Sequence, residues 1–221
     1  MNNAPISRGF KPGHASVPWN RGLRTPTELI TPAEVAKILA QCSKLSGSGL
    51  RNRALLLVMW RAGLRVAEAL ALEVRDVDTA QCTLHVRHGK GNKRRYVSID
   101  RSSMDAIARF IAARATFKSL SLISHVFTTH QGKPLRTSYV RQLIARLATQ
   151  AGIERRVHPH ALRHAFAVEL LYEATPLNMI QAQLGHSNLA TTSRYLAHVS
   201  PRDLNAVMQR RVMPAPVAGV L

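Results

Sequence analysis

The chain is short of acidic residues. Its 221 residues include 12 Asp and Glu against 31 Lys and Arg, which gives a formal net charge of +19. The excess is spread along the chain, because no acid lies between Asp78 and Asp100 or between Asp105 and Glu154. A folded domain with such a field favours a polyanionic partner, and nucleic acid is the first candidate. A basic surface that serves only solubility is the alternative.

Cysteines and long apolar runs are scarce as well. Cys42 and Cys82 are the only cysteines, too few for a disulfide framework. No stretch is apolar for long enough to cross a membrane. The first residues, MNNAPISRGFKPGHASVPWNRG, contain no apolar signal core. We therefore expect a cytoplasmic protein that makes no contact with a membrane. Its hydrophobic content of 46% is still enough for a sizeable core.

Three segments differ in composition. Residues 1–28 are rich in Pro, Gly, Asn and Arg and show no periodicity, which predicts a basic, largely extended N-terminal arm. Residues 29–212 alternate periodic stretches with short breaks and are expected to form the folded domain. Residues 213–221, MPAPVAGVL, predict a flexible C-terminal tail.

Most of the folded part has helical periodicity. In TPAEVAKILAQC, Thr31 is a good N-cap, Pro32 suits the first helical position, and Glu34 can close a capping box. SGSG breaks this helix, and LRNRALLLVMWRAG predicts a second one, apolar almost all round and therefore central, which ends at Gly63. Further helices are predicted at LRVAEALAL, SSMDAIARFIAAR, RTSYVRQLIARLATQAG, HPHALRHAFAVELL, TPLNMIQAQLG, SNLATTSRYLAHV and SPRDLNAVMQRR.

One segment changes period. In CTLHVRHGKGNKRRYVSI, apolar and polar residues alternate on both sides of the loop HGKGNKR, which predicts an antiparallel β-hairpin. The predicted fold class is therefore mainly α with a small antiparallel β-hairpin or sheet (α+β).

The helix HPHALRHAFAVELL combines a polar start with an apolar continuation. His160 and Arg163 are three residues apart and share one face. Leu162, Phe166 and Leu170 are spaced four apart and are expected to point into the core. Such a polar pair on a buried helix is typical of a rigid functional site. It is equally typical of a capped, solvated first turn.

Four motifs in order extend this pattern: GLRVAEALAL, HGKGNK, HPHALRHAFA and LGHSNLATTSRYLAHV. With these motifs the chain resembles the catalytic domain of tyrosine site-specific recombinases, the phage integrase family, from about Thr31 to Arg211. It is similar to the short, fimbrial-type invertases, which consist of little more than this domain. The resemblance implies the tyrosine recombinase catalytic-domain fold and six catalytic residues: Arg65, Lys90, His160, Arg163, His186 and Tyr195. It also implies that Glu68 and His164 support the site.

The family resemblance assigns each residue a role in phosphodiester cleavage. Guanidinium groups bind phosphate oxygens bidentately and keep their charge, so Arg65 and Arg163 would clamp the phosphate. Tyr195 would be the nucleophile that forms a covalent phosphotyrosine. The remaining assignments are His160 as base, Lys90 as acid for the leaving oxygen, and His186 as a hydrogen-bond donor to the phosphate. Neither a cofactor nor a metal is expected.

Each assignment has a simpler alternative. Arg65 and Glu68 could form an ordinary surface ion pair three residues apart. The basic hairpin residues Arg87, Lys93, Arg94 and Arg95 are predicted to bind DNA, yet Lys93 could also replace Lys90 as the acid. A zinc site could be suggested by His158, His160 and His164, but no cysteine or H-E-x-x-H pattern accompanies them. Tyr195 on its own would be an interfacial aromatic residue.

The expected function is site-specific recombination: cleavage and rejoining of double-stranded DNA through a 3′-phosphotyrosyl intermediate, with integration, excision or inversion as the outcome. The alternatives are relaxation of DNA by a type IB topoisomerase-like reaction, or a non-catalytic DNA-binding accessory protein of the same fold. The resemblance further implies a homotetramer on paired sites and a nucleoid-associated location. The arm at 1–28, or an accessory DNA-binding protein, could replace the core-binding domain found in most family members; otherwise the arm is an unimportant leader.

Overall fold

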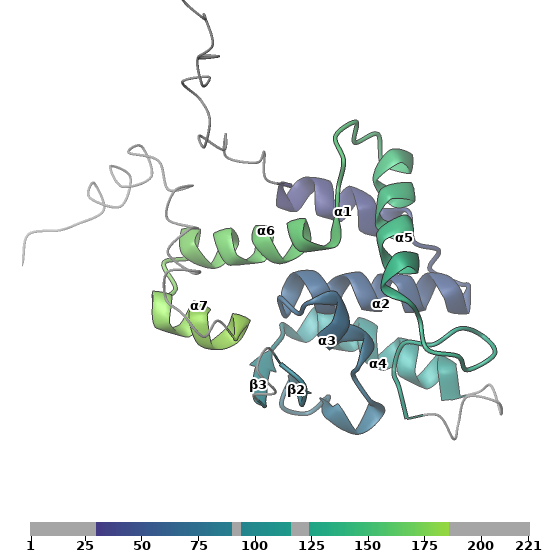
Figure 1. Ribbon diagram of the computed structural model, residues 1–221, viewed down its shortest axis with the longest axis horizontal. Coiled ribbons are helices and arrows are strands. Elements are labelled where there is room, and N and C mark those ends of the chain that lie inside the picture. The colour runs from purple at the N-terminus through teal and green to yellow at the C-terminus, as the bar shows by residue number, and fades with distance from the viewer. Residues whose placement is uncertain (1–29, 90–93, 116–123, 186–221) are drawn as a thin grey trace, which may run out of the picture.

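A computed structural model describes residues 30–89, 94–115 and 124–185 (Figure 1). The elements in these ranges are mostly helices: α1 (Pro32–Ala40), α2 (Gly47–Arg61), α3 (Val66–Leu70), the 3-10 turn η1 (Val74–Asp76), β1 (Val77–Asp78), β2 (Thr83–Val86), β3 (Arg95–Ser98), α4 (Arg101–Ala115), α5 (Thr137–Gln150), α6 (Pro159–Tyr172) and α7 (Leu177–Leu184). The prediction of a mainly helical α+β fold is confirmed. In the described part of the chain no helix has the length and apolarity needed to span a membrane.

Helix α2 is the central element. Its side chains from Ala54 to Met59 are all buried, and α4 and α6 pack against it. In Figure 1 the α6 ribbon runs above α2. The sequence prediction of a central helix is confirmed, but the helix begins at Gly47 rather than Leu50. The reason is a cap: the Ser46 hydroxyl accepts a hydrogen bond from the backbone N–H of Gly49 at 3.1 Å.

The first helix begins as predicted. The Thr31 hydroxyl accepts a hydrogen bond from the backbone N–H of Glu34, and the Glu34 carboxylate accepts one from the backbone N–H of Thr31 at 2.8 Å. This reciprocal capping box satisfies two donors that the first turn leaves open. Glu34 also forms an ion pair with Arg155, so the start of α1 is tied to the connection between α5 and α6.

The predicted hairpin is present and belongs to a three-stranded antiparallel sheet in the order β1-β2-β3. Leu84 pairs with Val97, and both side chains are buried on the inner face. Strand β1 was not predicted, because two residues are too short to show a period of two. Helix α7 packs against β3, as Figure 1 shows beside the hairpin. The predicted arm, the tail and the two helices after residue 186 lie outside the described residues.

Candidate active site

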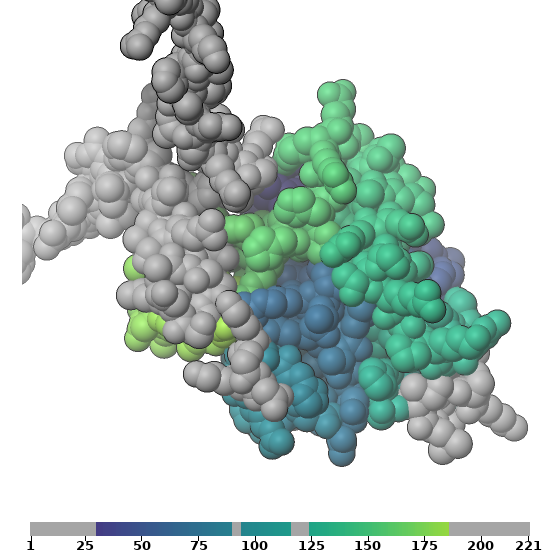
Figure 2. Space-filling model, viewed as in Figure 1, coloured from purple at the N-terminus to yellow at the C-terminus, as the bar shows by residue number. Residues whose placement is uncertain are grey.

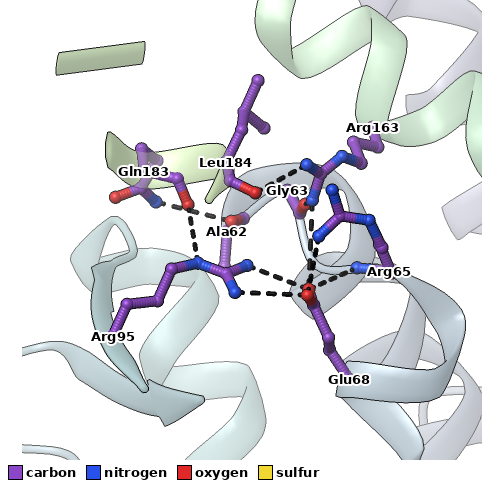
Figure 3. A network of polar contacts seen from close by, with 8 residues as sticks. All are labelled: Ala62, Gly63, Arg65, Glu68, Arg95, Arg163, Gln183 and Leu184. Atoms are coloured by element: carbon purple, nitrogen blue, oxygen red, sulfur yellow. Dashed lines mark hydrogen bonds and ion pairs between the residues drawn. The ribbon is translucent and has the colours of Figure 1, made fainter. Parts of the chain in front are cut away.

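A buried carboxylate lies at the centre of the candidate site (Figure 3). The Glu68 side chain, on α3, is only 3% exposed. Its Oε1 accepts a hydrogen bond from Arg65 Nη1 at 2.8 Å, and its Oε2 accepts one from the Arg65 backbone N–H at 3.0 Å. The pair that the sequence left open as a surface contact is therefore real, but it is not a surface contact, because its acid is buried.

Arg95 contacts the same carboxylate from β3. Its Nη1 and Nη2 donate to Glu68 Oε1 and Oε2 at 3.2 and 2.9 Å, which is a bidentate pairing. Arg163 Nη1 lies 3.9 Å from Oε2. A carboxylate has about four acceptor positions, and Arg65 and Arg95 use all four. Among the described residues three guanidinium groups thus surround one carboxylate, which leaves positive charge in excess.

Arg163 is held by main-chain oxygens. Its side chain is 1% exposed. Nη1 donates to the carbonyl oxygen of Gly63 in the turn between α2 and α3, and Nη2 donates to that of Leu184, at the end of α7, at 2.6 Å. Because these carbonyls belong to two different segments, the orientation of the guanidinium group is fixed by the packing of three helices. A charged group this deeply buried requires such bonds.

Arg65, His160 and Arg163 line one cavity of about 550 Å³. Its other lining residues are Leu64, Val66, Thr137, Arg141, His158 and Pro159. Residues of α3, α5 and α6 meet on one face of the molecule in Figure 2. The sequence did not single out Arg141 or Thr137. Both residues lie at the start of α5, where no sequence motif marks them, and the packing of α5 beside α6 brings them to the cavity.

The first turn of α6 is capped and also borders the cavity. His158 caps the helix, since its Nδ1 accepts a hydrogen bond from the backbone N–H of Ala161 at 3.2 Å. His160 and Arg163 nevertheless both reach the cavity. The His160 and His164 rings make an edge contact, with centroids 4.5 Å apart and an interplanar angle of 85°. His164 therefore contacts His160, and its supporting role stays a prediction.

The end of α7 is attached to the same network. Gln183 Nε2 donates to the carbonyl oxygens of Ser98 and Ala62 at 2.7 and 3.4 Å, and its Oε1 accepts from the Ser98 backbone N–H. Arg95 Nε donates to the Gln183 carbonyl oxygen at 3.4 Å. These bonds connect strand β3, the turn after α2 and the last turn of α7, which immediately precedes position 186.

The hairpin arginines have different surroundings. Arg87 makes two hydrogen bonds to Asp76, at 2.7 and 2.8 Å, and lies 2.9 Å from Glu73 Oε2. Arg95 is 13% exposed and bonded to Glu68. Arg94 is exposed. That Arg87, Lys93, Arg94 and Arg95 bind DNA stays a prediction, and the structure adds that two of them have carboxylate partners within the fold.

These ion pairs shift the pKa values of the acids. Burial alone would raise the pKa of Glu68, but hydrogen bonds from Arg95 and then from Arg65, with the charge of Arg95, hold this pKa below its ordinary value. The pKa of Asp76 is likewise lowered: burial is the largest single influence and opposes the change, but hydrogen bonds from Arg87 and the Glu73 backbone N–H, with the charges of Arg87 and His85, together outweigh it. Both carboxylates are ionised at neutral pH and so stay paired with their arginines.

Four of the predicted site residues lie outside the described residues: Lys90, Lys93, His186 and Tyr195. The structure brings together Arg65, Glu68, His160, Arg163 and His164. Among the described residues no group of three His, Cys, Asp or Glu side chains could hold a metal ion.

Two arginines and a histidine thus meet at one cavity in a helical domain with a small antiparallel sheet. The sequence model of the phage integrase family matches residues 28–201. The chain therefore belongs to the phage integrase family, as its motifs predicted.

Relatives and solved structures agree with this assignment. The chain is 36% identical over 163 residues to the tyrosine recombinase XerC of Listeria monocytogenes serotype 4b, covering 73% of this chain and 54% of the relative. It is 36% identical over 192 residues to XerC of Halalkalibacterium halodurans, covering 85% and 63%. The crystal structure of XerA recombinase superposes with a TM-score of 0.74 at 28% identity, covering 86% of this chain and 67% of that one.

A second structure is that of XerH site-specific recombinase bound to palindromic difH substrate after cleavage. It has a TM-score of 0.68 and 26% identity, and the match covers 82% of this chain and 52% of that chain. The chain thus spans about half to two thirds of the length of these proteins. The tyrosine recombinase fold is confirmed, while the likeness to short fimbrial-type invertases stays a prediction.

Proposed function

We propose that this protein is a site-specific DNA recombinase that breaks and rejoins DNA through a 3′-phosphotyrosyl intermediate. One observation carries the proposal: Arg65, bonded to Glu68, and Arg163, 3.9 Å from the same carboxylate, line a common cavity with His160. Two guanidinium groups fixed beforehand suit a phosphate whose oxygens gain negative charge in the transition state. Membership of the family and similarity to XerC, XerA and XerH support it.

In this proposal the arginines bind the nonbridging oxygens of the scissile phosphate. The Tyr195 hydroxyl attacks phosphorus, its proton passes to His160, and the 5′ oxygen leaves with a proton from Lys90. His186 donates a hydrogen bond to the phosphate. The phosphotyrosyl bond forms as the phosphodiester bond breaks, so a 5′ hydroxyl of another strand can reverse the step without any cofactor. Arg141, which lines the same cavity, adds positive charge beside the phosphate.

The wider setting is part of the proposal. The partner is double-stranded DNA, which the excess of basic residues suits. Strand exchange between two duplexes requires a homotetramer on paired sites, and a cytoplasmic, nucleoid-associated location follows from that substrate. An accessory DNA-binding protein or the arm at 1–28 would supply the additional contacts needed to bind the duplex. Integration, excision and inversion share this chemistry.

The experiment that tests the function is covalent trapping. Duplexes that cover the DNA flanking the protein's own gene are synthesised with 5′-bridging phosphorothiolates and incubated with wild type and with Tyr195→Phe. Wild type should form an adduct that survives denaturation, and Tyr195→Phe should not, because it lacks the attacking oxygen. Equal behaviour of the two proteins would remove the enzymatic proposal in favour of a non-catalytic binding protein.

The topoisomerase alternative predicts a different requirement. A topoisomerase-like enzyme rejoins the original strand and relaxes supercoiled plasmids without paired sites. A recombinase produces exchanged strands only when two mapped sites are present. Relaxation of a plasmid that lacks the mapped site, at a rate similar to that of a plasmid with two sites, would favour the alternative.

A further inference from the structure

The residue with the most unusual position outside the expected catalytic set is Arg95. It was predicted from its charge as a DNA-binding residue of the hairpin. The structure instead directs its guanidinium group inward, where it is 13% exposed and bidentate to Glu68 (Figure 3). A guanidinium group occupied in this way has few donors left for a DNA phosphate.

Arg95 also links segments that bear the site. It lies on β3, which follows the hairpin loop with Lys90. Through Glu68 it reaches α3, the helix that starts at Arg65. Through the Gln183 carbonyl oxygen it reaches the end of α7. A Cβ placed on Gly185 would lie 2.7 Å from Arg95 Cζ, so this guanidinium group packs directly on the backbone before position 186.

We propose that Arg95 is a positioning residue: it holds Glu68 and the last turn of α7 in place, and so sets the orientation of Arg65 and Arg163 toward the scissile phosphate. The inference rests on the proposed function. Arg95 occupies one acceptor position on each Glu68 oxygen, and Arg65 occupies another on each. Without Arg95 those positions are open, and the carboxylate is free to rotate toward Arg163, 3.9 Å away.

The electrostatics point the same way. Burial works against the ionised form of Glu68, and hydrogen bonds from Arg95 are the largest influence in its favour. Removal of Arg95 therefore raises the pKa of Glu68, the carboxylate beside both Arg65 and Arg163. The consequence is a looser arginine pair rather than a lost DNA contact.

The test compares Arg95→Met and Arg95→Lys with wild type and with Arg61→Met. Arg61 is a matched control, because it too forms ion pairs within the fold, with Asp100 at 3.1 Å and with Glu169 at 2.8 Å, but away from Glu68. The readouts are the single-turnover cleavage rate at saturating DNA, the DNA dissociation constant and the urea denaturation midpoint. Cleavage is measured on the mapped site with a normal phosphate and with a 5′-bridging phosphorothiolate, whose sulfur leaves without a proton.

We expect Arg95→Met to slow cleavage about 10- to 100-fold, the size of effect known for residues that orient metal ligands. The deficit should be equal on both substrates, and the dissociation constant should change less than about threefold. Arg95→Lys should recover part of the rate, because it keeps the charge but not the fork. Arg61→Met should lower the denaturation midpoint without slowing cleavage.

Other results overturn the inference. A wild-type rate in Arg95→Met, or an equal loss in Arg61→Met, would reduce Arg95 to general stability. Rescue by the phosphorothiolate would assign it to the lysine loop, and a large rise in the dissociation constant at an unchanged rate would make it a DNA contact. The proposed function fails separately, when wild type and Tyr195→Phe both form no adduct.

Discussion

Two arginine–carboxylate clusters flank the sheet, and they differ in charge balance. Around Glu68, three guanidinium groups from Arg65, Arg95 and Arg163 surround one carboxylate. In the second cluster, which comprises Glu73, Arg75, Asp76 and Arg87, two guanidinium groups face two carboxylates. The second cluster neutralises itself and holds β1, η1 and the hairpin together. The first cluster keeps excess positive charge beside a cavity, where it can bind an anion.

The difference distinguishes arginines that stabilise the fold from those proposed as catalytic. Both clusters contain buried acids, bidentate bonds and carboxyl pKa values below the ordinary range. Perturbed pKa values alone therefore do not distinguish a functional cluster from one that only stabilises the fold. The ratio of cations to anions and the access to a cavity make the distinction.

The largest effect is expected from Arg163→Lys. A lysine keeps the charge but cannot reach the carbonyl oxygens of Gly63 and Leu184 together. Cleavage should fall by at least about 10²–10³, as when one preorganised donor to an oxyanion is lost. Single-turnover trapping with phosphorothiolate DNA measures it. Arg61→Lys is the control, and an equal loss there would show that any arginine of the core matters as much.

A second pair of variants tests the clusters against each other. Glu68→Gln and Asp76→Asn each remove one buried negative charge beside arginines, and each should lower the free energy of unfolding by about 3 kcal/mol. Only Glu68→Gln should also slow cleavage, by about tenfold or more, because it alone touches the cluster with excess charge. Urea denaturation and single-turnover rates give the two numbers. Equal rates in both variants would remove the distinction.

Two glycines provide a finer test of the contact between α7 and Arg95. Gly185 and Gly152 both have positive φ, +65° and +73°, so alanine at either costs about 1–2 kcal/mol of backbone strain. A Cβ at Gly152 meets nothing within 4 Å, whereas at Gly185 it meets Arg95. Gly185→Ala should therefore lose cleavage activity several-fold beyond Gly152→Ala at matched stability, as trapping rates on folded protein would show.

The smallest effect is a pH dependence. Since the pKa of Glu68 is lower in the folded protein, its ionised form stabilises the fold at neutral pH, and this stabilisation is lost as the pH falls below about 4.5 through the lowered pKa. Glu68→Gln should make the acid decline in the free energy of unfolding shallower. The pKa of Glu169 is raised by burial, so its contribution has the opposite sign. Glu169→Gln should not flatten the acid decline, and urea titrations between pH 3 and 6 measure both slopes.

Local patterns made much of the fold predictable. The capping box of Thr31 and Glu34 and the alternation around Leu84 and Val97 are carried by neighbouring residues, and both were predicted. Strand β1 was missed because two residues carry no period. The start of α2 was placed too late because the glycines of SGSG favour a break, and the Ser46 cap prevailed.

The sequence motifs predicted which residues would line the cavity, but they did not predict the contacts that these residues make. Arg65, His160 and Arg163 came from spacing and family resemblance, and they do share a cavity. The inward turn of Arg95 and the carboxylate partners of Arg87 depend on segments far apart in the sequence, so no local pattern signals them. Basic residues in a hairpin loop look alike in sequence, whichever way they point.

The hydrogen bond from Arg163 to the Leu184 carbonyl oxygen has a consequence for heat tolerance. The last turn of α7 holds this guanidinium group through one carbonyl oxygen, and helix ends open before cores do. Fraying of a single turn would remove one of the two carbonyl acceptors that orient the guanidinium group, while Gly63, α2 and its neighbours stay packed. On warming, such a protein would lose DNA cleavage activity before its circular dichroism changes. It would regain this activity on cooling, because the rest of the fold had stayed intact.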